Sequence, residues 1–149
     1  MKNILVLLII ATLSSCGGYK PIFSGENVNF YIEEINIDKE NSISRKIAKK
    51  LRPYTSENSK KGIKLNINSA ENERVISKDN KGDPLIFEIT LEIIVDFNSK
   101  NYQEKITYTE SFSYNNQSNK FDLNQYKKDL IDDLIKKIFE KLIIKLRAI

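Results

Sequence analysis

The stretch LIFEITLEIIVDF, residues 85–97, decides the fold of this chain. Every second residue is apolar and falls on one face of an extended backbone: Leu85, Phe87, Ile89, Leu91, Ile93, Val95 and Phe97. The other face carries Glu88, Thr90, Glu92 and Asp96, with Ile86 and Ile94 interrupting it. A period of two over this length is typical of a strand with one buried face. It therefore predicts a sheet that is covered on one side only.

The flanking segments predict further strands of that sheet. Polar turn residues at 78–84 and 98–101 favour a hairpin on each side of the central strand. The strand after it has one face made of Tyr102, Ile106, Tyr108, Phe112 and Tyr114. The outward Lys105 discourages pairing with other chains if this strand is an edge. The strand before it rests on the alternation of Ile63, Leu65 and Ile67, and a polar stretch leaves open whether it resumes at Val75.

The first strand and the first helix are predicted at the start of the domain. Apolar residues alternate at Val28, Phe30 and Ile32 and then continue one step out of phase at Ile35 and Ile37. That change of phase indicates a bulge near Glu33 and Glu34. Asn41 or Ser42 is a good N-cap for a helix with one apolar face, and Pro53 ends that helix or follows its last turn.

A long helix is predicted at the C-terminus. Asp122 and Gln125 have the spacing of a capping box, and no Pro or Gly follows before Leu146. The apolar residues form two adjacent rows, made of Leu130, Leu134, Ile138 and Leu142 and of Ile131, Ile135, Phe139 and Ile143. A stripe this wide is typical of a helix that lies on a sheet. A dimerising coiled coil is the alternative, although the apolar step is closer to 4 than to 3.5.

These elements predict an α+β fold in the order β-α-β-β-β-α. We expect a two-layer sandwich, with a four-stranded mixed sheet and two helices packed on one of its faces. A single domain over residues 28–149 accounts for all of them.

Composition excludes several classes of function. The chain has 149 residues, a net charge of +4, no His and one Cys. Without His there is no Ser-His-Asp triad and no imidazole zinc site, and a lone Cys forms no internal disulfide. The small basic excess is spread along the chain, so it favours a solvated surface over nucleic-acid binding. The close carboxylate pairs are at 33–34, 71/73 and 132–133. Neighbours on a strand point to opposite faces, so Glu33 and Glu34 suit neither catalysis nor a metal unless a bulge turns them, and Asp132 and Asp133 have lysines at ion-pair spacing on their helix. No phosphate loop occurs, so we expect neither an enzyme nor a cofactor.

The N-terminus predicts an export signal that ends at the only Cys. Lys2 precedes an apolar run over 4–13, which is too short for a membrane span of about 20 residues. Leu13-Ser14-Ser15-Cys16 resembles a bacterial lipobox, in which the Cys thiol receives diacylglycerol and its new amine an acyl chain. We therefore expect a signal peptide over residues 1–15, lipidation with palmitate-like chains at Cys16 and a tether over 16–27. A buried first element of a cytosolic domain is the alternative. Gly17, where an Asp would favour inner-membrane retention, favours the outer membrane.

The whole chain resembles the LptE family of lipopolysaccharide-assembly lipoproteins. The Cys and the residues after it, Gly17-Gly18-Tyr19-Lys20-Pro21-Ile22-Phe23, are similar to that family's opening. The turn at Asp83-Pro84, the stretch Ser113-Tyr114-Asn115-Asn116 and the ending Leu142-Ile143-Ile144-Lys145-Leu146 are similar too. The resemblance implies two helices on a four-stranded sheet and no catalytic residues.

The resemblance also implies partners. LptE-like proteins plug the lumen of the LptD β-barrel in the outer membrane, help that barrel to fold and help deliver lipopolysaccharide, so an LptD-like barrel and lipopolysaccharide are the expected partners. Basic side chains that could contact lipid A phosphates are Arg74, Lys78, Lys81, Lys105 and Lys120. Two other hypotheses stay open. One is a periplasmic lipid-binding or transporter-accessory lipoprotein that acts without a barrel, and the other is an unrelated lipoprotein that dimerises through its last helix.

Overall fold

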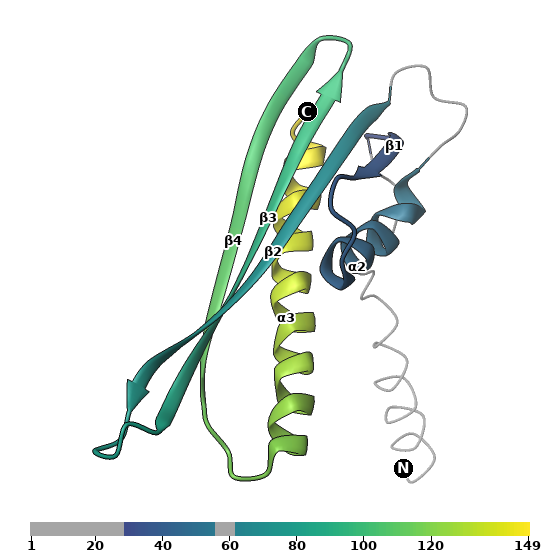
Figure 1. Ribbon diagram of the computed structural model, residues 1–149. Helices are drawn as coiled ribbons and strands as arrows, with labels where there is room; N and C mark the ends of the chain where they lie inside the picture. The colour runs from purple at the N-terminus through teal and green to yellow at the C-terminus, as the bar shows by residue number, and fades with distance from the viewer. Residues whose placement is uncertain (1–28, 56–61) are drawn as a thin grey trace, which may run out of the picture.

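The expected two-layer arrangement is confirmed in a computed structural model, which describes residues 29–55 and 62–149. One sheet contains four strands in the order β1-β2-β3-β4, and the helices α2 and α3 cover one of its faces. Figure 1 shows α3 running along the sheet with α2 beside it. Strand β1 pairs parallel to β2, and the other two pairs are antiparallel, so the sheet is mixed as predicted.

The β1 strand (Ile32–Ile37) contains the predicted bulge. Ile32 lies opposite Ile63 of β2, and Glu34 lies opposite the next residue, Lys64, so Glu33 is the extra residue. Gly62 approaches this bulge closely, because a Cβ on Gly62 would lie 2.6 Å from the Cβ of Glu33. The bulge and the glycine therefore depend on each other.

Helix α2 (Ser42–Leu51) begins at the predicted cap. The side chain of Asn41 accepts hydrogen bonds from the backbone N–H groups of Ile43 and Ser44, at 3.0 and 2.9 Å. The amide of Asn41 also donates to the carbonyl of Ser69 in β2, at 2.9 Å, so this cap ties the helix to the sheet. Pro53 follows the last turn, inside the short 3-10 helix η3 (Arg52–Tyr54).

Strand β2 (Ile63–Lys78) is continuous, although its sequence pattern suggested an interruption. Its first half is buried on alternate residues, but Ala70 to Ile76 are all exposed. Pairing with β3 (Pro84–Ser99) holds this second half in register as far as Val75. A polar stretch can stay in a ladder when a neighbouring strand satisfies its backbone groups, which is why alternation alone missed it.

The turn between β2 and β3 is built as its sequence predicts. The carboxylate of Asp79 accepts from the backbone N–H groups of Lys81 and Asp83, at 2.8 and 2.9 Å. Gly82 has a φ of 90°, which L side chains rarely adopt, so glycine is required there. The next hairpin leads into β4 (Tyr102–Asn115), which is an edge strand with Lys105 exposed, as expected.

Helix α3 (Lys120–Arg147) begins earlier than predicted. Its N-cap is Asn119, whose side chain accepts from the N–H groups of Phe121 and Asp122, so Asp122 lies inside the first turn. Asp122 instead accepts from the side-chain amide of Asn119, at 2.7 Å. The two apolar rows lie on the sheet as predicted, and the buried residues of the helix are Leu130, Leu134, Ile135, Ile138, Leu142, Ile143 and Leu146.

Candidate interaction surfaces

The sheet face opposite α2 and α3 is polar. Its positions on β2 and β3 include Asn66, Asn68, Asn72, Thr90 and Asp96, which pair with one another or with neighbours across the ladder. Its positions on β4 include Gln103, Lys105, Thr107, Thr109, Ser111 and Ser113. Most of these side chains are short and hold hydroxyl or amide groups, as in the 2.9 Å contact between the hydroxyls of Thr90 and Ser111. This face can therefore offer many hydrogen bonds to a polar partner.

The outer edge of β4 adds backbone groups to that surface. Strand β4 pairs with β3 on one side, and among the described residues no strand pairs with its other side. Edge strands leave a row of N–H and C=O groups without a sheet partner. The open face and this edge together form one continuous polar surface.

Ion pairs join the opposite, covered face to α3. Lys127 of α3 lies 3.2 Å from a carboxylate oxygen of Glu71 and 2.9 Å from one of Glu73. Glu73 also accepts a hydrogen bond from the hydroxyl of Tyr114 in β4. The Glu71/Glu73 pair, in which the sequence suggested no function, thus holds the N-terminal half of α3 to the distal half of β2.

These contacts raise the pKa of Lys127. Partial burial opposes the charged form, but the hydrogen bonds to Glu73 and Glu71 outweigh that effect and move the pKa above its usual value. A similar pair occurs at the sheet edge, where a hydrogen bond from Lys64 lowers the pKa of Glu34. The charged states of these groups are therefore part of the folded structure.

The C-terminal half of α3 is joined to β4 in the same way. Lys145 lies 2.6 Å from Glu104 and 5.6 Å from the ring centroid of Tyr102, and Lys141 pairs with Glu110. Sequence reasoning missed both carboxylates, because in a strand pattern they interrupt an otherwise apolar face. Burial beneath this helix raises the pKa of Tyr108 to about 12.

The basic residues predicted to contact phosphate do not form one site. Arg74 lies in the distal half of β2 and is paired with Glu88 at 2.6 Å. Lys120 lies at the start of α3, where its ammonium donates to the side chain of Asn116 at 2.7 Å. Lys105 lies near the opposite end of the sheet, paired with Asp96 at 3.3 Å.

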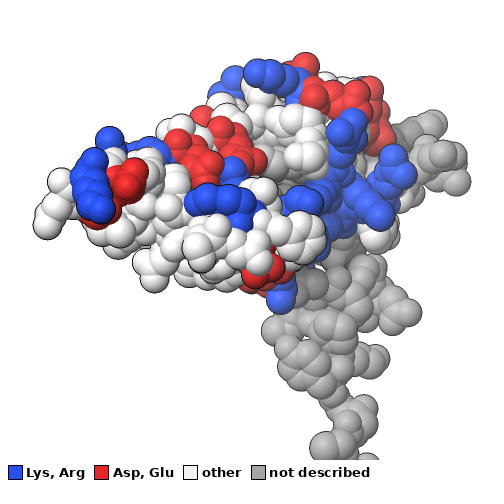
Figure 2. All heavy atoms as spheres, turned by 60° about the horizontal axis from the view of Figure 1, so that its bottom comes forward, with Lys and Arg blue, Asp and Glu red and all other residues white. Residues whose placement is uncertain are grey.

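Of the other two predicted residues, Lys78 ends β2 and Lys81 lies inside the β2–β3 turn. Acidic residues accompany this group, since Asp79 and Asp83 belong to the same turn. Figure 2 shows the mixture at the left end of the molecule, where blue and red side chains alternate. The hairpin end is therefore close to neutral rather than strongly basic.

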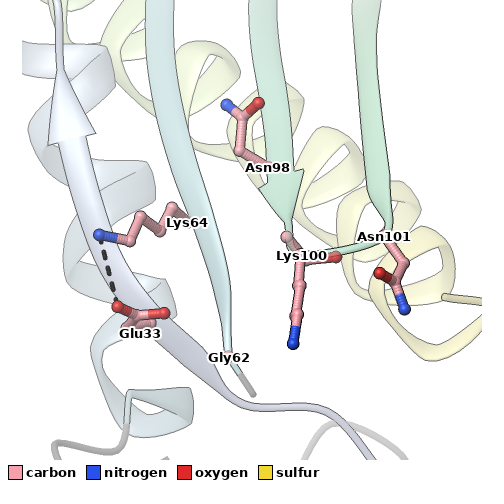
Figure 3. A pocket seen from close by; sticks show the side chains of 7 residues that line it. Glu33, Gly62, Lys64, Asn98, Lys100 and Asn101 are labelled. Carbon is pink, nitrogen blue, oxygen red and sulfur yellow. Dashed lines mark ion pairs between the residues drawn. The ribbon is translucent and has the colours of Figure 1, made fainter. Parts of the chain in front are cut away.

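A hollow opens at the other end of the sheet, between β1, β2 and the β3–β4 turn. Its volume is ≈ 790 Å³, and Glu33, Lys64, Asn98, Lys100 and Asn101 are among the residues that line it. Figure 3 shows the side chains of Lys64 and Glu33 facing each other, at 3.4 Å, with Lys100 projecting from the turn. The lining side chains are polar, so this hollow does not suit an acyl chain.

The predicted lipidation site lies outside the described residues. Cys16, Gly17, the signal peptide over 1–15 and the tether over 16–27 all precede residue 29. Within residues 29–55 and 62–149, no helix is long and apolar enough to cross a membrane. The same residues contain no group of three or more His, Cys, Asp or Glu side chains that could hold a metal ion.

Comparison with solved structures places this fold among bacterial lipoproteins. The rare lipoprotein B of Shewanella oneidensis is similar with a TM-score of 0.61 and 10% identity over 77% of this chain and 93% of the other. An uncharacterized lipoprotein B from Nitrosomonas europaea is similar with a TM-score of 0.61 and 14% identity, over 88% and 91% of the two chains. A lipoprotein from Caulobacter crescentus gives 0.55 and 15%, over 76% and 88%.

Comparison of sequences gives no relative. No protein-family model and no curated protein matches the chain. At these low identities the structural likeness establishes the fold, which agrees with the resemblance to LptE that the sequence motifs indicated.

Proposed function

We propose that this chain is an LptE-type lipoprotein, anchored in the outer membrane through lipid on Cys16. Its domain associates with the polar lumen of an LptD-like β-barrel, helps that barrel to assemble and assists the delivery of lipopolysaccharide. The observation that carries the proposal is the open sheet face, with its Asn, Thr and Ser side chains and the free edge of β4 beside it. A barrel lumen is polar, so a plug needs many hydrogen-bonding groups and few apolar ones on its contact surface.

Three further observations support this function. The fold matches that of lipoproteins over most of both chains. The sequence has the lipobox-like ending at Cys16 and the motif order of the LptE resemblance. The ion pairs between α3 and the sheet make the domain a firm unit, as a plug requires.

Lipid binding without a barrel is less well supported. A lipid carrier needs an apolar cavity, and the hollow beside β1 is lined by polar side chains. Native mass spectrometry of delipidated protein tests this alternative, because a retained phospholipid in the domain would favour it.

The anchor is tested by metabolic labelling with a palmitate analogue. We expect the label on the wild-type protein and none on Cys16→Ala, while the circular dichroism of the variant stays that of a folded α+β domain. Label that persists in the variant would contradict lipidation at Cys16. Loss of folding would mean that Cys16 has a structural role.

The barrel partner is tested by copurification from detergent extracts of membranes. A tagged wild-type chain should recover a large β-barrel protein, and Thr107→Arg with Thr109→Arg, on the open face of β4, should reduce that recovery at least tenfold. The matched control is Asn124→Arg with Gln125→Arg, which adds the same charge at exposed positions of α3. Recovery of only inner-membrane proteins, or an equal loss with both variants, would overturn the proposal.

A further inference from the structure

The exposed side of α2 and η3 carries positive charge and no acidic residue of its own. Between residues 42 and 55 the chain has five exposed cations, Arg45, Lys46, Lys49, Lys50 and Arg52, and no Asp or Glu. We call these five residues the α2 basic face. Outside this segment the remaining 19 Lys and Arg are outnumbered by 20 Asp and Glu, so the net charge of the chain comes from the α2 basic face.

Few acidic residues neutralise this face from neighbouring elements. Arg45 is paired with Glu40 at 3.4 Å, and Lys46 is paired with Asp132 of α3 at 2.5 Å. Lys49, Lys50 and Arg52 form no ion pair within residues 29–55 and 62–149. Lys50 lies 5.7 Å from the ring centroid of Phe139, which directs its ammonium along the surface of the helical layer.

These cations surround a hollow that fits an anionic group. Lys46, Lys49, Lys50 and Asp132 line a volume of ≈ 480 Å³ between α2 and α3. Figure 2 shows blue side chains gathering at the right of the view, the side on which α2 lies in Figure 1. A phosphate oxygen accepts hydrogen bonds from ammonium and guanidinium groups, so this arrangement suits phosphate better than the neutral hairpin end does.

The N-terminal segment joins the domain beside the same face. Phe30 stacks on Tyr54 of η3 with ring centroids 5.5 Å apart, and the side-chain amide of Asn29 donates to the carbonyl of Arg147 at 3.2 Å. Thirteen peptide steps separate Asn29 from Cys16, and a chain of that length spans at most about 45 Å. A lipid anchor on Cys16 would therefore hold Asn29 within about 45 Å of the membrane surface, so the α2 basic face beside it can reach that surface.

We propose that the α2 basic face binds the anionic phospholipid headgroups of the membrane in which the chain is anchored. This contact orients the domain, with α2 against the membrane surface and the β2–β3 hairpin directed away from it. The proposal relies on the lipid anchor but not on the barrel partner. A lipid chain combined with a basic patch is a recurrent form of membrane attachment, and each cation near an anionic surface strengthens binding about fivefold.

The test measures the charge-dependent part of vesicle binding. Full-length protein with Cys16→Ala, which lacks the lipid, is sedimented with vesicles of phosphatidylcholine alone and with vesicles of phosphatidylcholine and phosphatidylglycerol in a two-to-one ratio. Binding to the first measures the contribution of the apolar leader, and the increase with the second isolates the electrostatic contact. We expect a clear increase that high salt removes, because ions screen the attraction.

Two matched triple variants locate that contact. Lys49→Gln, Lys50→Gln and Arg52→Gln should reduce the phosphatidylglycerol-dependent increase on the order of 100-fold. Lys78→Gln, Lys81→Gln and Lys105→Gln remove the same charge elsewhere and should reduce it far less. No increase for the unsubstituted protein, or an equal loss with both variants, would overturn the proposal.

A second measurement needs no substitution in the domain. Acetylation of lysines by a water-soluble reagent, read by mass spectrometry, should slow at Lys49 and Lys50 when the lipidated wild-type protein is held in phosphatidylglycerol-containing vesicles. Lys78 and Lys81 serve as internal references whose rates should not change. Equal slowing at all four positions would contradict an oriented contact. Barrel copurification is measured separately, so either proposal can fail without the other.

Discussion

The two helices pack on the same face of the same sheet and are both rich in Lys, yet their cations differ in what they contact. Three lysines of α3 pair with carboxylates of the sheet: Lys127 with Glu71 and Glu73, Lys141 with Glu110 and Lys145 with Glu104. Three of the five cations of the α2 basic face, Lys49, Lys50 and Arg52, have no acidic partner among the described residues. Lys therefore has two roles here. In α3 it joins the two layers, and in α2 it leaves charge available to a partner outside the chain.

The largest expected effect comes from what the helices share, which is the apolar core. Ile47 of α2 and Ile138 of α3 are both fully buried. Ile47→Ala or Ile138→Ala should each lower the free energy of unfolding by about 2–5 kcal/mol, because each leaves a cavity in one common core. Urea denaturation followed by circular dichroism measures this. A biphasic curve for Ile47→Ala, with α2 unfolding first, would show that the two helices do not unfold as one cooperative unit.

Removing the N-cap of either helix should lower the free energy of unfolding by less than these core substitutions do. Asn41 bonds two N–H groups of α2, the carbonyl of Ser69 and the hydroxyl of Ser69, in a half-buried position, whereas Asn119 caps α3 at an exposed position. Asn41→Ala should cost about 2 kcal/mol and Asn119→Ala about 0.5–1 kcal/mol. Equal losses in the free energy of unfolding would mean that the contact of Asn41 with β2 adds no stability.

Single lysines provide the sharpest contrast. Lys127→Gln should destabilise the fold by about 1 kcal/mol, because it leaves Glu71 and Glu73 side by side without their cation. Lys49→Gln, at an exposed position without an ion pair among the described residues, should change stability by less than about 0.5 kcal/mol. The same denaturation curves measure both, and a larger loss for Lys49→Gln would reverse the assigned roles.

The smallest expected effect at cellular pH comes from the groups near α3 whose pKa is raised, because they change stability only at alkaline pH. The folded state raises the pKa of Lys127, and burial raises the pKa of Tyr108 to about 12. Groups with a raised pKa stabilise the fold fully below their unfolded values, near 10 for both residue types, and lose that contribution as the pH rises through the folded values. Stability should therefore fall between about pH 10 and pH 12. Tyrosinate absorbance during a pH titration should show Tyr108 ionising late, and simple ionisation of all tyrosines near pH 10 would contradict its burial.

The sequence predicted the features that depend on periodicity. The alternation over residues 85–97 and the two apolar rows of α3 specified a covered sheet, and the change of phase after Ile32 specified the bulge. Periodicity could not show that β2 continues past Ser69, because a strand exposed on both faces has no apolar face to reveal it. The start of α3 was misplaced by three residues, because Asn119 and Asp122 are both good N-cap residues and only geometry decides between them.

The candidate surfaces were predicted less well than the fold. The five cations proposed to contact phosphate were chosen one at a time, and the structure places Lys105 away from the others and pairs Arg74 with Glu88. The α2 basic face was missed, although the segment RKIAKKLR, residues 45–52, contains five cations and no acid. Average charge hides such a cluster, because acidic residues elsewhere balance it. Counting charge for each element separately would have found it.

The continuous but exposed second half of β2 affects where the molecule unfolds locally. Beyond Ser69 this strand depends on its hydrogen-bond ladder with β3 and on Lys127 rather than on buried apolar side chains of its own. Opening the turn end of the hairpin, where Ile76 and Leu85 are already exposed, would expose little further apolar surface, so it should cost far less free energy than unfolding the domain. Backbone amides there should exchange with solvent deuterium by local opening. Those beneath α3 should exchange only through global unfolding. The hairpin can thus bend and adapt to a surface that it meets while the layered body behind it keeps its shape.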